Sequence, residues 1–249
     1  MTATGCLAAN DWICGEYVRS RRYELLDAVV QHVGIAFSSV VLGLVVAFPL
    51  ALAARRWGAG PVLGLTTVLY TIPSLAMFAL LLPVFGISAG IVVTGLVLYS
   101  LTVLVRNLIA GFEAVPEEVR EAARGMGYGP RQLLLGVELP LLLPALMAGV
   151  RIATVSAISL TTVGAIVGYG GLGNLIYSGM ENFFKAEVLT ASAICVVLAV
   201  LADLLLLGLQ WLITPWSRHR AGRGRYFEFL LGDDPGTMAV AVHRLQLVR

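Results

Sequence analysis

The feature that most constrains this chain is a long run without a charged side chain, from Trp57 to Val105. A hydrocarbon core of roughly 30 Å is crossed by about 20 helical residues, so this run is long enough to cross a membrane twice. Over the whole chain, 58% of the residues are hydrophobic and 13% are charged. A soluble domain has about 25% charged residues, which form the hydrated faces of its helices and strands. The sequence therefore predicts an integral membrane protein.

Charge-poor runs along the chain predict five membrane-spanning segments. Lipid offers no partner to an unpaired backbone N–H or C=O group, so each segment is expected to be helical and the fold class to be all-α. Pro49 and Pro73 lie inside the first two segments, where each removes a helical hydrogen bond and favours a kink. The expected spans are residues 33–54, 62–84, 87–109, 142–167 and 188–213.

The placement of basic residues predicts the orientation of the chain. With five spans the termini lie on opposite sides, and most arginines fall on the side that holds the loop between the third and fourth spans. Positive residues favour the cytoplasmic side, so the N-terminus is expected to be outside. Cys6 and Cys14 would then lie outside, where a disulfide and two free thiols are both compatible with the sequence. The expected division is an external segment at residues 1–32, a transmembrane domain at 33–213 and a cytoplasmic tail at 214–249.

Residues 111–140 lie between the third and fourth expected spans, and their sequence predicts a short amphipathic helix. Pro116 followed by Glu117 favours a helix start, because acidic side chains interact with the positive end of the helix dipole. Gly127 favours its end, and Pro130 starts a second helix. Such a helix fits either an interfacial connector or an insertion into a groove on a partner protein. Its apolar stripe consists of Val115, Val119, Ala122 and Met126.

The full pattern of this loop is more specific than its amphipathic stripe. Glu-Ala-Ala at 121–123 is followed by three residues, Gly127, nine residues and Val-Glu-Leu-Pro at 137–140. This pattern resembles the EAA loop of the permease subunits of bacterial binding-protein-dependent ABC importers. The resemblance implies a type I importer permease, whose cytoplasmic coupling helix-turn-helix, between the third and fourth spans, docks into a groove on a separate ATPase. It also implies that residues 111–140 form the coupling loop and that its coupling residues are Glu121, Ala122, Ala123, Gly127, Leu139 and Pro140.

Further segments are similar to permeases for glycine betaine, choline, proline betaine and related osmoprotectants. Importers for methionine or sulfonates share the loop but less of the YTIPSLA segment. The resemblance implies a multi-pass protein of the bacterial plasma membrane that works with a second permease chain, identical or related, two cytoplasmic ATPases and an external solute-binding protein. The similar segments are YTIPSLA at 70–76, LYS at 98–100, VRN at 105–107, AGVR at 148–151 and GYGGLG at 168–173.

Patterns that would indicate catalysis by this chain are missing from the sequence. A P-loop needs G-x-x-x-x-G-K-[ST], and the one lysine, Lys185, lies in no such pattern. GYGGLG follows no predicted strand, so we expect a glycine-rich turn or re-entrant corner and not a dinucleotide site. The three histidines are widely separated and predict no metal site, and the net charge of +2 gives no reason to expect nucleic acid. We expect a transport subunit that is not an enzyme and has no cofactor.

Polar residues within the spans are candidates for a solute pathway, although ordinary packing between membrane helices also explains each of them. Arg151 and Asp203 lie about ten residues from the cytoplasmic ends of their spans, which at 1.5 Å per residue is roughly 15 Å for both. Charges at such depth are usually paired, so we expect an ion pair; the alternative is that Arg151 extends alone toward the interface. The pathway candidates are Ser74, Met77, Tyr99, Ser100, Thr161 and Thr162.

Three other functions are compatible with parts of this pattern. One is an ABC permease for another small solute, such as an amino acid or a sulfonate. Another is an ion-coupled secondary transporter, which predicts paired carboxylates near the membrane midplane, where this sequence offers Asp203 alone. The last is a non-transporting membrane scaffold, for which the coupling loop would be an interaction site only.

Overall fold

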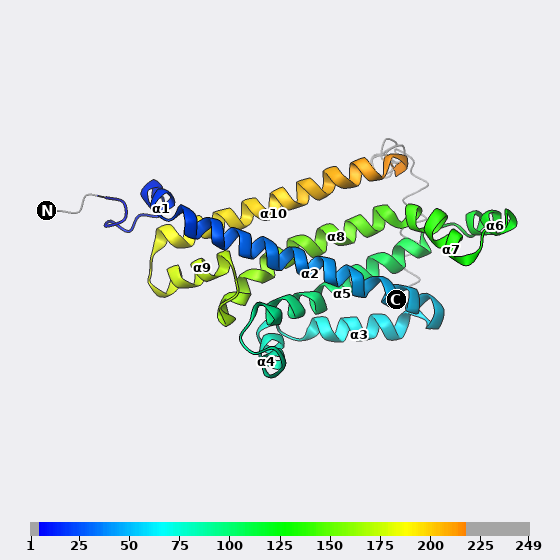
Figure 1. Ribbon diagram of the computed structural model, residues 1–249, viewed down its shortest axis with the longest axis horizontal. Helices are drawn as coiled ribbons and strands as arrows, with labels where there is room; N and C mark the ends of the chain where they lie inside the picture. The colour runs from blue at the N-terminus through cyan, green and yellow to red at the C-terminus, as the bar shows by residue number, and fades with distance from the viewer. Residues whose placement is uncertain (1–4, 218–249) are drawn as a thin grey trace, which may run out of the picture. The chain divides into compact units, whose positions relative to one another are not determined.

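The computed structural model describes residues 5–217, and every regular element in that range is a helix (Figure 1). Met1–Ile213 forms one compact unit, and of the second unit, Thr214–Arg249, the described part contains a 3-10 helix, η3 (Pro215–Ser217). Most of the predicted tail at 214–249 therefore lies outside the described residues. The other elements are α1 (Gly15–Ser20), α2 (Arg22–Trp57), α3 (Ala59–Thr71), α4 (Ser74–Phe85), α5 (Ala89–Glu113), α6 (Glu117–Gly125), α7 (Pro130–Leu133), the π-helix η1 (Leu134–Glu138), α8 (Leu139–Thr161), the 3-10 helix η2 (Thr162–Val167), α9 (Leu172–Glu181) and α10 (Lys185–Ile213).

Within the described residues, four helical segments are long and apolar enough to cross a membrane, judged by length and composition. They are α2, α5, the continuous stretch Pro130–Val167, and α10. A fifth crossing is present if α3 and α4 together form one span, although these two helices meet at an angle of 97°. The all-α fold with about five spans is thus confirmed.

The second predicted span differs from a single kinked helix. Pro73 is the residue before α4 and not an interior residue, so the expected kink is a complete break between two helices. Ile72 has an extended backbone with ψ of 125°, because the proline ring disfavours the helical conformation of the residue before it. Pro49, in contrast, lies within α2, which continues to Trp57.

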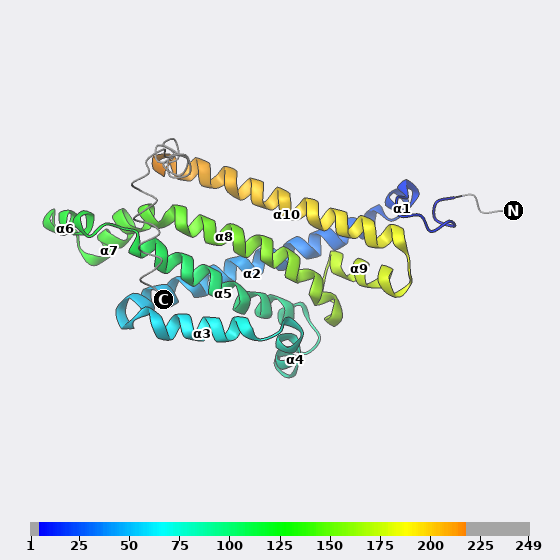
Figure 2. The same ribbon diagram turned by 180° about the vertical axis from the view of Figure 1, so that it is seen from behind.

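Helix α5 forms the centre of the bundle and packs against α2 and α8, with α3 and α4 on its remaining side (Figures 1 and 2). Alanines of α2 at 47, 51 and 54 are buried against the leucines of α5 at 104 and 108. Small side chains allow membrane helices to approach closely, which gains dispersion energy where lipid supplies no hydrophobic driving force. Helix α10 packs on α8 and α9.

The glycine-rich segment GYGGLG forms, as expected, a tight turn that leads from η2 into the first residues of α9, and it closes over His32 of α2. The His32 side chain is fully buried, and its ring nitrogens lie 2.9 Å from the Ile158 carbonyl oxygen and 3.1 Å from that of Gly170. Gly171 has φ of +56°, and a Cβ at this position would lie 2.6 Å from the Cβ of His32. The helix α9 that follows was missed in the sequence, which indicated no span between 167 and 188.

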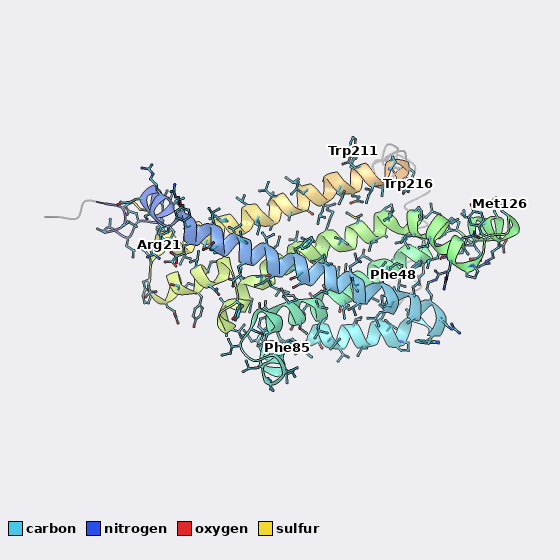
Figure 3. All side chains as sticks on the ribbon, viewed as in Figure 1. Arg21, Phe48, Phe85, Met126, Trp211 and Trp216 are labelled. Carbon is cyan, nitrogen blue, oxygen red and sulfur yellow. A yellow bond between two sulfur atoms is a disulfide. The ribbon has the colours of Figure 1, made fainter. Side chains whose placement is uncertain are left out.

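The N-terminal segment contacts the turn between α9 and α10. Cys6 and Cys14 form a disulfide, which decides between the two alternatives that the sequence left open. Inside the closed loop, the Asn10 amide donates to the Phe183 carbonyl oxygen at 2.8 Å and accepts from the Lys185 backbone N–H at 3.0 Å. This end of the bundle is the one opposite α6, as the labelled Arg21 and Met126 show in Figure 3.

Candidate coupling site and solute pathway

Helix α6 projects from the end of the bundle where α2 and α5 terminate and α8 begins (Figure 1). It starts after Pro116 and carries acidic residues in its first turn. After the helix ends at Gly125, Gly127 adopts a left-handed φ of +87° that reverses the chain toward α7. The expected start and end of this helix are therefore confirmed. The second helix of the loop is continuous with the fourth span, because α7, η1 and α8 follow one another without a break.

The coupling residues inferred from the resemblance lie in two positions. Glu121, Ala122 and Gly127 are exposed on and just beyond α6, whereas Ala123 is buried. Leu139 and Pro140 form the half-buried first turn of α8. The apolar stripe is divided in the same way: Val115 is buried in the bundle, and Val119, Ala122 and Met126 are exposed. The exposed part of α6 is thus available to a partner, and its buried side holds it to the bundle.

A buried carboxylate anchors α6. Glu138, with 2% of its side chain exposed, receives two hydrogen bonds from the Arg55 guanidinium, at 2.6 and 2.8 Å. Its oxygen Oε1 also accepts from Nε of Arg120 at 2.9 Å. Arg55 is in the last turn of α2 and Arg120 is on α6, so one carboxylate at the start of α8 joins three helices. Paired arginines make a buried carboxylate tolerable, because bidentate contacts satisfy its lone pairs.

Arg120 extends this network along α6 and to α5. Its guanidinium donates to the Glu117 carboxylate at 3.0 Å and to the Phe112 carbonyl oxygen at 2.5 Å. Burial disfavours its charge, but the hydrogen bonds to Glu117 and Glu138 outweigh this effect and raise the pKa of Arg120. The hydrogen bond from Arg120 also holds the pKa of Glu117 below its usual range. Both groups therefore stay charged at neutral pH.

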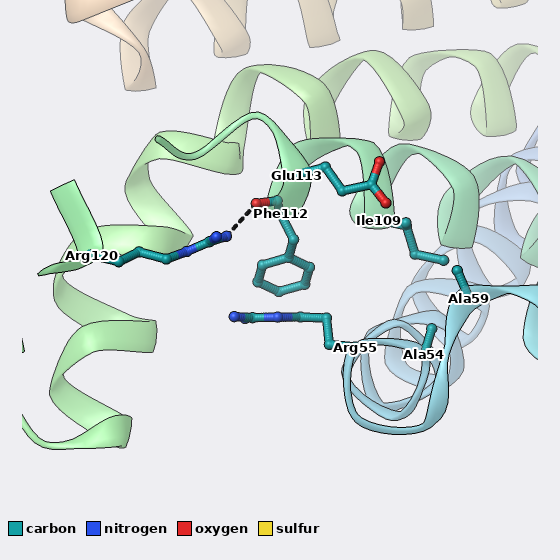
Figure 4. A pocket seen from close by; sticks show the side chains of 7 residues that line it. All are labelled: Ala54, Arg55, Ala59, Ile109, Phe112, Glu113 and Arg120. Atoms are coloured by element: carbon teal, nitrogen blue, oxygen red, sulfur yellow. Dashed lines mark hydrogen bonds between the residues drawn. The ribbon is translucent and has the colours of Figure 1, made fainter. Parts of the chain in front are cut away.

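A pocket of about 290 Å³ lies beside this network (Figure 4). The Arg55 guanidinium stacks on the Phe112 ring, 4.5 Å from its centroid. Arg120, from α6, donates to the backbone carbonyl oxygen of the same phenylalanine. The sequence did not reveal this set of contacts. A signal was present in Glu138, an acid between apolar neighbours in VELP, which requires a cationic partner when it is buried.

The pathway candidates do not all lie together. Tyr99 and Ser100 of α5 line a second pocket of about 290 Å³ between α3, α5 and α8. Met77 is buried against Gly95, and the buried Thr161 hydroxyl donates to the Ala157 carbonyl oxygen, so both have packing contacts. Thr162 and the half-buried Ser74 are also not among the residues that line this pocket.

The sequence profile of one protein family, described as binding-protein-dependent transport system inner membrane component, matches residues 39–219. The chain belongs to this family. The expected permease subunit of an ABC importer is thereby confirmed, and both the ion-coupled transporter and the scaffold are set aside. The match begins within α2 and covers all later helices of the bundle.

Individual members of this permease family are similar over most of the chain. The choline transport system permease protein OpuBB of Bacillus subtilis (strain 168) is 32% identical, covering 82% of this chain and 95% of that protein. The osmoprotectant import permease protein OsmW of Salmonella typhimurium (strain LT2) is 36% identical, covering 77% and 92%. The inward-facing MetNI methionine ABC transporter has a chain with the same fold, at a TM-score of 0.71, 21% identity and coverage of 78% and 98%.

The structure brings Arg151 and Asp203 of this permease together. Nε and an Nη nitrogen of Arg151 each donate to one carboxylate oxygen at 2.8 Å, which joins α8 to α10.

We expect Arg151→Gln and Asp203→Asn each to lower the unfolding midpoint of the purified chain by about 2–4 °C, because each leaves an unpaired charge among apolar helices. Exchanging the two residues is expected to restore much of the loss. Independent effects of the two single variants, with no rescue, would contradict a structural role for the pair.

Proposed function

We propose that this chain forms the solute pathway of an importer for osmoprotectants such as glycine betaine, choline or proline betaine. The observation that carries the substrate class is similarity, over 77–82% of the chain, to permeases named for choline and for osmoprotectants. An amino acid or a sulfonate is the alternative cargo, supported by the shared fold of a methionine transporter. Pathway residues would be those of the pocket that contains Tyr99 and Ser100.

The remaining parts of the transporter would be separate chains. Two cytoplasmic ATPases would each receive one α6, an external binding protein would deliver the solute, and a second permease chain would complete the pathway. The excess of arginines near α6 supports a cytoplasmic position for this end and an external N-terminus. ATP hydrolysis would belong to the partner chains.

The anchoring of α6 supports a direct mechanical link between the ATPase and the spans. A force on α6 is transmitted through Arg120 and Glu138 to Arg55, and so reaches the ends of α2 and α5 and the start of α8. Because these contacts are short and converge on a buried carboxylate, α6 would move with the spans as one body. Closure of two ATPases would therefore bring two coupling helices together and reorient both bundles.

Charge and shape changes on the exposed part of α6 test the docking site. We expect the combined variant Glu121→Arg and Gly127→Asp to lose its ATPase on co-purification through a tag on the permease. Glu121 is exposed, and the reversal places a positive charge on the proposed contact surface. A Cβ added at Gly127 would meet no other atom within 4 Å, so its replacement acts mainly through backbone strain and added charge.

A matched control places the same changes at the other end of the bundle. Glu16→Arg combined with Gly15→Asp alters exposed residues of α1 and is expected to retain the ATPase. Both double variants must elute as folded protein in detergent, with helix content equal to that of the wild type. Unchanged ATPase binding by the α6 variant would contradict the docking site, even with family membership established.

A further inference from the structure

An exposed arginine lies inside one of the spans. Arg106 is on α5, about two turns before its end at Glu113, and its guanidinium donates to the Thr67 hydroxyl of α3 at 3.0 Å. A charge within a span is costly where it faces lipid, so such charges face water or a ligand or, near a helix end, extend to the membrane interface. The described contacts of Arg106 include no carboxylate. This position therefore offers a cation with free donors to an anionic group.

An aromatic pair lies next to Arg106 along the same two helices. Tyr70 of α3 and Tyr99 of α5 meet edge to face, with ring centroids 5.9 Å apart. The Tyr99 hydroxyl donates to the Ile72 carbonyl oxygen, which fixes its ring, and Tyr70 is 53% exposed. Residues 67 and 70 are one turn apart on α3, so Thr67, which accepts from Arg106, and Tyr70 are separated by about 5 Å along the helix axis.

Both tyrosines line the pocket between α3, α5 and α8. Among the described residues that form its walls, none carries a charge. Ser156 and Ser159 of α8 are exposed and also line this pocket. The pocket thus combines aromatic rings and small hydroxyl groups. Arg106 is not one of its lining residues, but it contacts α3 at Thr67, one helical turn from the exposed ring of Tyr70.

We propose that this site binds a zwitterionic quaternary ammonium solute, a betaine, during its passage. The ammonium would contact the exposed ring of Tyr70, which packs edge to face with the buried Tyr99, since aromatic rings attract a cation that cannot donate hydrogen bonds. The carboxylate would accept hydrogen bonds from Arg106, whose planar fork matches a carboxylate. The two charges of a betaine are separated by a few bonds, and one helical turn of α3 separates Tyr70 from Thr67, which holds the guanidinium. This inference rests on the proposed osmoprotectant transport and assigns its specificity to Arg106.

A cationic solute without a carboxylate would make different contacts at this same site. Choline carries the same trimethylammonium group but ends in a hydroxyl. Arg106 would therefore repel its positive charge and donate at most one hydrogen bond to the hydroxyl, a contact that water can replace. The site therefore favours betaines over choline, and removal of the Arg106 charge is expected to reduce or reverse that preference.

Uptake by the assembled transporter tests this assignment. We compare radiolabelled glycine betaine and choline in proteoliposomes that contain the permease, its ATPase and its binding protein. Arg106→Gln is expected to lower glycine betaine uptake about tenfold and to leave choline uptake unchanged or raised, because a charge-assisted hydrogen bond contributes a factor of about ten. Tyr70→Leu is expected to lower uptake of both solutes. Arg56→Gln, which removes an exposed arginine at the same end of the bundle, is expected to change neither.

Three results would overturn the proposal, and they differ from one another. Equal loss of both solutes in Arg106→Gln would assign the residue to packing or coupling, and unchanged glycine betaine uptake would remove it from the site. Wild-type transport of neither compound would reject the osmoprotectant function itself.

Thr67→Val keeps the shape of the side chain but removes the hydroxyl that holds the guanidinium. A smaller loss of glycine betaine uptake in this variant supports the site, and no loss opposes it.

Discussion

Replacing Glu138 by glutamine is expected to release α6 from the bundle and to lower both stability and ATP-driven uptake. The carboxylate is shared by Arg55 and Arg120, and glutamine leaves Arg55 without its counter-charge and Arg120 with Glu117 alone. Breaking a buried ion pair costs about 3–5 kcal/mol, and we expect about 2–4 kcal/mol here because Arg55 can turn to solvent. Arg55 has 34% of its side chain exposed and Arg120 has 15%.

The loss of uptake is expected to exceed what the loss of folded protein explains. Coupling free energies between distant sites are about 1–3 kcal/mol, so an α6 without its anchor is expected to lower uptake about 5- to 150-fold per folded transporter. Unfolding is followed by thermal denaturation in detergent, and uptake is measured in proteoliposomes with matched amounts of folded protein. ATPase co-purification is expected to be retained, because the exposed face of α6 is unchanged.

Two controls separate the network from a general effect of charge. Glu118→Gln makes the same change at an exposed position on α6 and is expected to behave as the wild type. Arg55→Lys removes the bidentate contact and the stacking on Phe112, whereas Arg56→Lys alters the exposed neighbour. Arg55→Lys is therefore expected to lower stability and Arg56→Lys to leave it unchanged. A Glu138→Gln protein that unfolds and transports like the wild type would contradict the anchoring role.

The number and type of spans were predictable because they depend on local composition. Runs of about 20 apolar residues have few alternatives in a bilayer, so α2, α5, α8 and α10 follow from the sequence. The break at Pro73 was underestimated, since a proline inside a span gives either a kink or an interruption and tertiary packing decides between them. Helix α9 was missed because its ten residues are too few to cross a membrane.

The functional contacts were harder to predict because they join residues that are distant in the sequence. Glu138 and Arg55 are 83 positions apart, and nothing in either neighbourhood indicates the other as its partner. Arg151 and Asp203 were exceptions, since rare charges at equal depth in two spans leave few choices of partner. The residues proposed to contact the ATPase were inferred from the spacing of a known pattern, which carries no information about what holds them in place.

Substituting Gly171 by alanine is expected to be strongly destabilising. Two separate costs add at this position. The φ of +56° costs an L-residue about 1–2 kcal/mol. The new Cβ would also lie 2.6 Å from the Cβ and 2.7 Å from the backbone nitrogen of His32, and such overpacking costs about 1–3 kcal/mol.

Gly168→Ala isolates the first of these costs. Gly168 has a similar φ of +80°, but a Cβ there has nothing within 4 Å. We therefore expect Gly168→Ala to lower stability modestly and Gly171→Ala to lower it further by about 1–3 kcal/mol. Gly34→Ala, in helix α2 with open space around it, is expected to be neutral or slightly stabilising. Thermal unfolding of the four purified proteins in detergent measures the difference. Equal midpoints for the Gly168 and Gly171 variants would mean that α2 can shift near His32 at little cost. In that case the close contact between Gly171 and His32 would not fix the position of α9 relative to α2.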